Sequence, residues 1–543
     1  MSNSIVRVPP PRNEPVRDYA PGSVEKVSLK AKLAEMASEE IEIPVVVGGR
    51  EIRTGDLAEC VMPHDHGHVL ARYHQAGEAE VAAAADAARA AWATWSETPW
   101  EARAAVFLRA AELLAGPWRD AVNGATMLGQ SKTVYQAEID SACELIDFWR
   151  FNPAYLAELY SEQPNSSPGC WNRLEMRALE GFVFAVTPFN FTSIAGNLPT
   201  APAMMGNVSL WKPASSAVYS GWFIYKALEA AGVPPGVISF LPGRGATVGD
   251  PALGHPDLAG VHFTGSTGVF HRMWKTIGEN IERYRGYPRI VGETGGKDFV
   301  FAHASASVDA LTVALVRGAF EFQGQKCSAA SRAFVPASIW PELRDGLAGT
   351  LGEISMGAPT DFRNFVGAVI DRGAYRSIKA YVDHAKDDPG HEVLCGGGCD
   401  DSVGWFIEPT VVVASDPKSK LMSEEIFGPV LTVFVYDDAK LDDALTLCDE
   451  GSPYGLTGAV FAKDRAAIEK VSARLRHTAG NFYINDKPTG AVVGQQPFGG
   501  DRASGTNDKA GSKMNLLRWC SHRTIKELFV PPTSHAYPFM GEE

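Results

Sequence analysis

The chain has 543 residues, which is enough for two or three domains that each bury a core. Hydrophobic residues make up 45% of it and charged residues 21%, as is usual for a globular protein, and no apolar run approaches the roughly 20 residues of a transmembrane helix. The net charge of −14 argues against a nucleic acid or an anionic membrane as partner, because either would favour a basic patch.

The 8 cysteines are too few for a disulfide scaffold in a chain of this length, so the sequence fits a reducing compartment. Two of them, Cys395 and Cys399, bracket three glycines. Without a second pair of ligands, this spacing predicts a glycine-rich loop. We therefore expect no metal.

The N-terminal segment, residues 1–11, is rich in proline and lacks the apolar core of a signal peptide. Residues 28–40 are charged and predict a helix. We expect residues 1–40 to form an arm that wraps another part of the protein. We also expect a cytoplasmic location.

A short strand is predicted at 45–47, and alanine-rich segments follow it. Apolar side chains recur at helical spacing over 78–96, and the pattern continues over 103–114. Trp92 and Trp95 lie on this apolar face, so we interpret both as core residues.

Between residues 181 and 302, short apolar runs alternate with helical stretches. The runs are 182–186, 208–211, 237–241, 261–263 and 289–291, and the helices include 219–231 and 269–284. This alternation predicts a parallel sheet with helices on both faces, which suits a dinucleotide. The usual Gly-x-Gly-x-x-Gly is absent, because 243–249 has one residue too many between its glycines.

A second α/β unit is predicted from residue 294 onward. Its expected strands are 299–301, 333–335, 409–413, 430–435 and 458–461.

Cys327 lies in a stretch of small and polar residues, 322–329, with Lys326 beside it. The thiolate is the nucleophilic form of cysteine, and an ordinary pKa of about 8.5 leaves only a small fraction ionised at neutral pH. The charge of Lys326 and a helix start at this point could favour the thiolate. On this local pattern alone, a buried structural thiol is the commoner interpretation.

Glu293 ends an apolar run and is followed closely by Gly295 and Gly296. Such a glutamate can act as a general base on water, and the glycines let the backbone approach a bound ligand. A glutamate in a surface turn is the simpler alternative. Cys327 lies 34 residues further on, beyond any helical or hairpin spacing, so spacing alone does not bring the two together.

These two stretches resemble the glutamate and cysteine signatures of the aldehyde dehydrogenase superfamily. Other matching segments follow in the order of that family, at 187–191, 211–213, 263–267 and 424–429. The resemblance runs from about Val45 to about Glu527. Two later blocks, 494–500 and 502–509, resemble the branch of the family that acts on L-glutamate γ-semialdehyde.

The resemblance implies an α/β fold with a variant Rossmann cofactor domain, a second α/β catalytic domain and a small β oligomerisation element. The cofactor domain is expected at 41–168 and 182–293, and the catalytic domain at 294–505. The oligomerisation element is expected at 169–181 and 506–543, with strands that pair across subunits. Such uncovered strand edges favour a homodimer or a higher homo-oligomer.

The resemblance also implies the chemistry. Cys327 attacks the aldehyde carbon, Asn190 and the Cys327 backbone N–H donate to the developing oxyanion, and Glu293 activates the water that hydrolyses the thioester.

NAD is the implied cofactor. Lys212 would contact its adenosine ribose, Glu425 its nicotinamide ribose, and the loop and helix start at 265–269 its pyrophosphate. The expected cofactor residues are Thr187, Lys212, Gly265, Ser266, Thr267, Gly268, Val269, Thr294 and Glu425. Ser215 occupies a position where an acid would disfavour NADP, so NAD is an expectation from the family.

For the substrate, the resemblance implies that Ser328 and the backbone of Gly490 and Ala491 bind a carboxylate. The two rings that flank the aliphatic stem are Phe191 and Phe498, and Glu144 is expected near the site. Relatives often carry serine in place of Ala491, so this chain keeps the backbone N–H donor there and lacks a hydroxyl donor to the substrate carboxylate.

The implied reaction is the NAD-dependent oxidation of L-glutamate γ-semialdehyde, in equilibrium with 1-pyrroline-5-carboxylate, to L-glutamate, the second step of proline degradation. Three alternatives stay open: a dehydrogenase for another acidic semialdehyde such as succinate semialdehyde, a Cys/Glu hydrolase that needs no cofactor, and a silent scaffold. Proline dehydrogenase is a possible partner because the semialdehyde is its product, although no residue of the sequence indicates the partnership.

Overall fold

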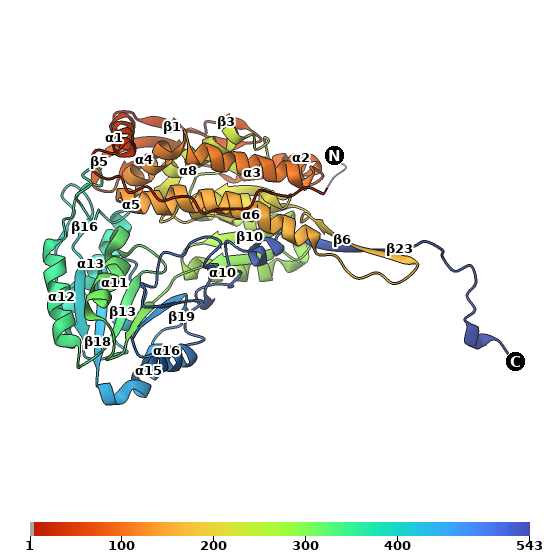
Figure 1. Ribbon diagram of the computed structural model, residues 1–543. Helices are drawn as coiled ribbons and strands as arrows, with labels where there is room; N and C mark the ends of the chain where they lie inside the picture. The colour runs from red at the N-terminus through yellow and green to blue at the C-terminus, as the bar shows by residue number, and fades with distance from the viewer. Residues whose placement is uncertain (1–4, 543) are drawn as a thin grey trace.

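The computed structural model describes residues 5–542, in which two seven-stranded sheets each form the centre of an α/β unit (Figure 1). The α/β class predicted from the sequence is confirmed. Among the described residues, no helix combines the length and the apolar character needed to cross a bilayer.

In the first sheet, the spatial order of the strands differs from their order in the chain. From edge to edge they are β11 (Arg289–Glu293), β10 (Leu258–Thr264), β7 (Phe182–Val186), β8 (Val208–Lys212), β9 (Ile238–Phe240), β2 (Val45–Val47) and β3 (Arg50–Ile52). Strands β7 to β11 are parallel, and β2 and β3 add an antiparallel edge. The predicted apolar runs between residues 181 and 302 therefore form one parallel sheet.

Two groups of helices flank this sheet. One group contains α2 (Glu78–Trp95), α9 (Gly245–Leu253) and α10 (Thr267–Glu279), and the other contains α3 (Trp100–Ala115), α4 (Arg119–Gln130), α6 (Glu144–Ser161), α7 (Thr192–Met204) and α8 (Val218–Ala231). Between α4 and α6 lie α5 (Val134–Ala137) and a π-helical turn, Glu138–Cys143. The helix predicted over 269–284 ends earlier, at Glu279, where the Asn280 side chain donates to the Thr276 carbonyl at 2.8 Å and satisfies a terminal acceptor.

The N-terminal arm lies along α4 to α6 (Figure 1). Its Tyr19 hydroxyl donates to Glu138 Oε2 at 2.8 Å, which anchors an extended segment that precedes α1 (Val24–Ala37). Helix α1 begins four residues before the predicted start, because the Ser23 hydroxyl accepts from the Lys26 amide at 3.3 Å and caps it. A three-stranded sheet, β1 (Ile41–Ile43), β5 (Asp65–His74) and β4 (Leu57–Met62), follows the arm.

The second sheet is also largely parallel. Its strands are β14 (His391–Cys395), β17 (Thr410–Ala414), β18 (Val430–Tyr436), β13 (Ala330–Pro336), β12 (Asp298–Ala302), β20 (Thr457–Phe461) and β21 (Asn481–Ile484), and only β14 runs antiparallel. Alternate residues of β12 point to opposite faces: Phe299 and Phe301 join one hydrophobic core, and Val300 and Ala302 join another.

The helices that supply these two cores lie on the two faces. Those of one face are α11 (Val308–Phe320) and α12 (Trp340–Glu353), and those of the other are α15 (Leu441–Glu450) and α16 (Arg465–Arg474). Helix α13 (Arg372–Asp387) packs near the β14 edge, and α14 (Lys420–Ser423) precedes β18. Two short strand pairs, β15 (Cys399–Asp400) with β16 (Phe406–Ile407) and β19 (Tyr454–Gly455) with β22 (Asp501–Arg502), complete this unit.

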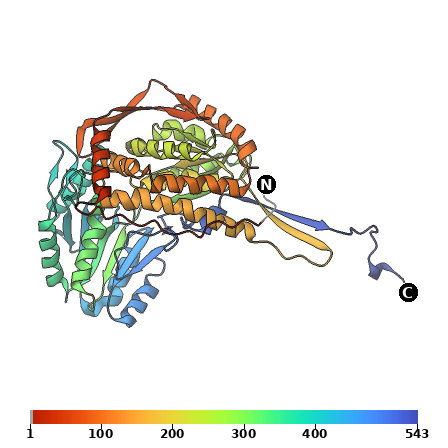
Figure 2. The same ribbon diagram turned by 45° about the horizontal axis from the view of Figure 1, so that its top comes forward.

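A two-stranded ribbon projects from the body of the protein (Figures 1 and 2). It pairs β6 (Cys170–Arg177) with β23 (Ser521–Leu528) in antiparallel register. The segment from 506 to 520, expected to belong to the same element, instead packs on the body: it contains α17 (Lys513–Leu517), and Trp519 is fully buried against His262. The ribbon therefore begins at Ser521 on the C-terminal side.

Candidate active site

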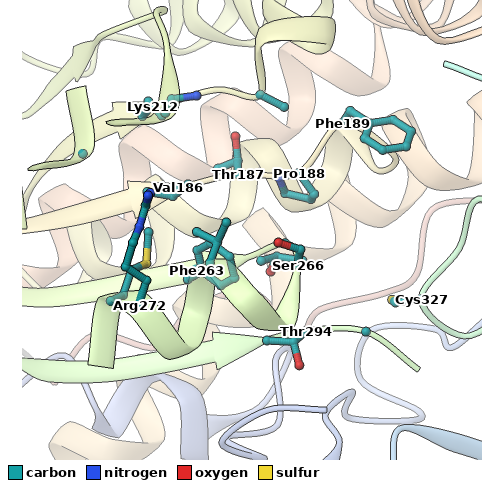
Figure 3. A pocket seen from close by; sticks show the side chains of 18 of the residues that line it. Val186, Thr187, Pro188, Phe189, Lys212, Phe263, Ser266, Arg272, Thr294 and Cys327 are labelled. Atoms are coloured by element: carbon teal, nitrogen blue, oxygen red, sulfur yellow. The ribbon is translucent and has the colours of Figure 1, made fainter. Parts of the chain in front are cut away.

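The first sheet has a topological switch point at its carboxyl edge. The switch point lies between β7 and β10. From β7 the chain adds β8 and then β9 in one direction, whereas β10 and β11 are added on the opposite side of β7. In open α/β sheets ligands bind at such points, because the loops from neighbouring strands diverge there. A cavity of about 430 Å³ lies at this place, and Figure 3 shows Lys212 and Arg272 toward one side of it and Cys327 toward the other.

Most of the residues predicted to bind the cofactor line this cavity. They are Thr187, Lys212, Gly265, Ser266, Val269, Thr294 and Glu425, and Asn190 and Cys327 line it as well. Thr267 and Gly268 are not among the lining residues, although they open α10 between Ser266 and Val269. The structure thus brings together segments that lie more than 200 residues apart in the chain.

Several lining residues are not among those predicted from the sequence. These are chiefly Phe189, Ala214, Gly245, Gly249, Arg272, Met273 and Phe427. Two of them carried a usable signal, because Gly245 and Gly249 belong to the near-miss glycine motif and lie on α9, the helix that follows β9. Phe189 and Phe427 lie inside the segments that carried the family resemblance, so proximity to those segments was the available clue.

Lys212 is a buried cation at the end of β8. Its Nζ donates to the Pro213 carbonyl at 2.9 Å, and it forms no ion pair with any described residue. Burial lowers the pKa of Lys212 to about 8, because desolvation disfavours the charged form. An anionic or hydroxyl-rich ligand in the cavity would supply the missing partner.

Glu425 faces the turn at 294–296. Its Oε1 accepts from the Gly296 amide at 3.0 Å. Burial raises the pKa of Glu425 to about 7, and the Gly296 hydrogen bond and Lys297 oppose that shift. The group therefore titrates near neutral pH.

The two glycines of that turn have a different role from the one expected. A Cβ at Gly295 would lie 2.2 Å from Glu425 Oε2, and a Cβ at Gly296 would lie 2.2 Å from the Cys327 carbonyl oxygen. The glycines therefore let the turn pass between Glu425 and Cys327, rather than only opening space for a ligand.

Cys327 follows a backbone turn of unusual conformation. Phe322 (φ 51°, ψ 40°), Gln323 (φ 55°, ψ 30°) and Gly324 (φ 64°) are all in the left-handed region. The left-handed conformation costs about 1–2 kcal/mol for each L residue, so surrounding contacts must hold this turn.

The expected activation of Cys327 by Lys326 and a helix start is wrong. No helix begins at Cys327, which lies in a loop before β13. The Lys326 ammonium donates to the Gln136 side chain and lies 3.7 Å from Asp140 Oδ2. Burial raises the pKa of Cys327 well above its ordinary value, and the charges of Asp298, Glu293 and Glu425 add to the shift.

Glu293 lies at the end of β11, directly before Thr294. Its Oε2 accepts from the Gly500 amide at 3.3 Å. Burial raises the pKa of Glu293 well above the ordinary range of a carboxyl group. Cys327 lines the cavity and Glu293 does not, so the meeting of these two side chains at one substrate stays a prediction.

Asn190 is buried beside the cysteine loop. Its Nδ2 donates to the Gln325 carbonyl at 3.1 Å, two residues before Cys327. This contact leaves a second N–H on the amide, which can serve an additional acceptor.

The predicted substrate residues lie outside the set that lines the cavity. Ser328 is buried next to Cys327, and its hydroxyl lies 2.8 Å from that of Thr489, directly before Gly490 and Ala491. Glu144 accepts from the Ser193 hydroxyl, and burial raises the pKa of Glu144 to about 8.

The two predicted aromatic residues have different neighbours. The Phe191 ring lies beneath the Lys132 ammonium, and the Phe498 backbone pairs with that of Ala510.

Comparison with known proteins agrees with this architecture. The model of the "Aldehyde dehydrogenase family" matches residues 52–525. A Dictyostelium discoideum protein named delta-1-pyrroline-5-carboxylate dehydrogenase, mitochondrial, is 55% identical over 98% of this chain and 96% of its own length. A Mycobacterium tuberculosis delta-pyrroline-5-carboxylate dehydrogenase, solved with NAD bound, is 54% identical with a TM-score of 0.96 and full coverage of both chains.

A longer chain also contains this fold. Proline utilization A from Bdellovibrio bacteriovorus is 30% identical with a TM-score of 0.90, and the match covers 96% of this chain and 53% of that one.

These comparisons correct one expectation. The prediction of a cytoplasmic location is wrong, because the Dictyostelium relative and several mammalian relatives are named as mitochondrial. The family resemblance read from the motifs is confirmed, since the family model spans most of the chain and the relatives match nearly all of it. The chain belongs to the aldehyde dehydrogenase family.

Proposed function

We propose that this protein oxidises L-glutamate γ-semialdehyde, in equilibrium with 1-pyrroline-5-carboxylate, to L-glutamate with NAD, as the second step of proline degradation. The observation that carries the proposal is a single cavity at the switch point that reaches from Lys212 to Cys327. The relatives named for this activity, at 54–55% identity, support the choice of substrate.

The cavity suits NAD on the chemistry of its walls. Lys212 offers a buried ammonium with no carboxylate partner among residues 5–542, and the start of α10 at Ser266 offers backbone N–H groups to phosphate. Glu425 offers an acceptor to ribose hydroxyls. When bound, NAD supplies the oxidant that removes a hydride from the substrate carbon.

Cys327 is the proposed nucleophile. Its sulfur forms a bond to the aldehyde carbon while the carbon–oxygen π bond breaks, and the negative charge that develops on oxygen is met by Asn190 Nδ2 and the Cys327 amide. Loss of the hydride from this adduct restores the carbonyl and leaves a thioester on Cys327. The thiolate is the attacking form, so the Cys327 thiol first gives its proton to water, and burial opposes this loss because it raises the pKa of Cys327.

Glu293 is the proposed general base for hydrolysis. It takes a proton from water as the water oxygen bonds to the thioester carbon, and the carbon–sulfur bond then breaks to release glutamate and regenerate the cysteine. Its raised pKa suits proton abstraction better than an ordinary carboxylate would.

For the substrate tail, Ser328 and the backbone of Gly490 and Ala491 are the proposed donors to the carboxylate. The short stem would lie between Phe191 and Phe498, with Glu144 nearby. This arrangement favours an acidic aldehyde over a neutral one.

The direct test measures reduced-nicotinamide absorbance after mixing the protein with the semialdehyde and NAD. We expect the highest kcat/KM for L-glutamate γ-semialdehyde, a lower value for succinate semialdehyde, and no turnover by Cys327→Ala. Equal specificity for the two aldehydes would overturn the substrate assignment. Turnover of esters that persists at the same rate without NAD would favour the hydrolase alternative.

Two partner proposals remain. The ribbon of β6 and β23 leaves Trp171 exposed at 49%, and we propose that a second copy of the chain covers it in a homo-oligomer. Removal of residues 521–543 should then reduce the mass measured by light scattering.

Proline dehydrogenase is the second candidate partner, since it forms the substrate. Transfer of its product without release to a competing trap would support that partnership.

A further inference from the structure

Lys132 is a buried cation that the proposed mechanism does not use. Its Nζ lies 2.6 Å from Asp140 Oδ2 and 4.4 Å from the ring centroids of both Phe191 and Phe322. The lysine side chain has no exposed surface. An ammonium between aromatic faces is held more firmly when it is desolvated than at the protein surface.

The two rings belong to two different parts of the proposed machinery. Phe191 directly follows Asn190, the proposed oxyanion donor, and leads into α7. Phe322 opens the left-handed turn that leads to Cys327. One ammonium therefore contacts both the donor segment and the nucleophile segment.

The residue before Lys132 holds the same turn. The Gln323 side chain donates to the carbonyls of Ser131 at 3.1 Å and Ala368 at 2.7 Å, and it accepts from the Gly367 amide at 3.0 Å. The left-handed backbone is thus held by contacts with Ser131, which follows α4, and with Gly367 and Ala368.

Asp140 links Lys132 to the other lysine of this region. Its Oδ2 lies 2.6 Å from Lys132 Nζ and 3.7 Å from Lys326 Nζ, next to Cys327 in sequence. When one of two cations is removed, the buried charge of the carboxylate is left less compensated and its surroundings must adjust. Loss of Lys132 would therefore disturb Lys326 and the cysteine loop as well as the two rings.

We infer that Lys132 is a positioning residue that keeps the Cys327 sulfur and the Asn190 amide in register on either side of the aldehyde. Its catalytic benefit rests on the proposed function, whereas the placement of Cys327 can be measured without any aldehyde.

The test compares wild type, Lys132→Met, Lys132→Arg and a control, Arg119→Met, which removes a buried cation of α4 that pairs with Glu14 and Glu138 away from the cavity. The readouts are kcat for the semialdehyde, the affinity for NAD, the melting temperature, and the rate at which iodoacetamide alkylates Cys327, with Cys327→Ala as the blank.

We expect Lys132→Met to lower kcat about 10- to 100-fold, because displacement of a reacting group by about 1 Å can cost 100-fold. The alkylation rate of Cys327 should change with it, while NAD affinity stays at the wild-type value. Lys132→Arg should restore part of kcat and part of the alkylation rate of Cys327, since a guanidinium can also lie on aromatic faces and pair with a carboxylate. Arg119→Met should lower the melting temperature alone.

A Lys132→Met protein with wild-type kcat and alkylation rate, but a lower melting temperature, would overturn the inference in favour of a purely structural lysine. If that variant does not fold, Phe322→Leu decides: a changed alkylation rate supports the inference and an unchanged rate overturns it. If wild type fails to oxidise the semialdehyde while Lys132→Met still alters alkylation, the proposed function fails and the positioning role stands.

Discussion

The two sides of Cys327 are built in opposite ways. Toward the first sheet lies an open cavity with few charged walls, whose principal cation, Lys212, has no carboxylate partner in the described structure. Away from it, Lys132, Asp140 and Lys326 fill the space with a buried, mutually paired network. The open side is suited to receive a ligand, and the packed side is suited to hold a nucleophile.

Among the variants that test the two sides of Cys327, Glu293→Gln is expected to have the largest effect on turnover. Loss of the base should lower steady-state turnover about 10²- to 10⁴-fold, while one equivalent of NADH per site still forms as the thioester accumulates. Rapid-mixing absorbance measures both. A variant that loses the initial burst as well would place Glu293 before hydride transfer.

The same substitution should raise the melting temperature at pH 7. Because burial raises the pKa of Glu293, folding disfavours its charged form, so the contribution of this group to stability falls as the pH rises above the unfolded value. Glutamine carries no such penalty. A lower melting temperature for the variant at pH 7 would contradict this reasoning.

Asn190→Ala tests the place where the open cavity meets the packed side of Cys327. The amide contacts the Gln325 carbonyl and lines the cavity, so its loss should lower kcat about 10²- to 10³-fold if it stabilises the oxyanion. NAD affinity should stay unchanged. Equal losses in NAD affinity and in kcat would instead indicate a collapsed cavity.

Lys212→Met tests the open side alone. It should weaken NAD binding about 10-fold, which corresponds to a hydrogen bond from a charged donor, and leave alkylation of Cys327 unaffected. Calorimetric titration with NAD gives the affinity. Unchanged binding would show that the unpaired ammonium is not used by the cofactor.

The smallest effect should be a pH dependence of NAD affinity. The Glu425 carboxyl has its pKa raised to about 7, so it is protonated below that pH and accepts hydrogen bonds from ribose less well. NAD affinity should therefore rise a few-fold between about pH 6 and 8. Glu425→Gln should abolish this rise, and a rise that persists in that variant would assign it to another group.

The sequence predicted the open side better than the packed side. The strands that meet at the cavity are short apolar runs bounded by small residues, so they could be predicted from the pattern, whereas the proposed cofactor residues came from local segments that resemble the aldehyde dehydrogenase family. The packed side could not be read in this way, because Lys132 and Phe322 are brought together only by tertiary packing. For the same reason the sequence could not show which groups Lys326 contacts, since adjacency to Cys327 does not determine the direction of its side chain.

The turn at Gly295 and Gly296 limits how this protein can evolve. A Cβ at Gly296 would lie 2.2 Å from a backbone atom of Cys327, and one at Gly295 would lie 2.2 Å from the Glu425 carboxylate, so a substitution at either position forces a shift beside Cys327. At Gly245 and Gly249, by contrast, an added Cβ would meet no atom within 4 Å. A side chain can therefore be added at either of these two positions in the wall of the cavity, while the turn beside Cys327 has no room for one.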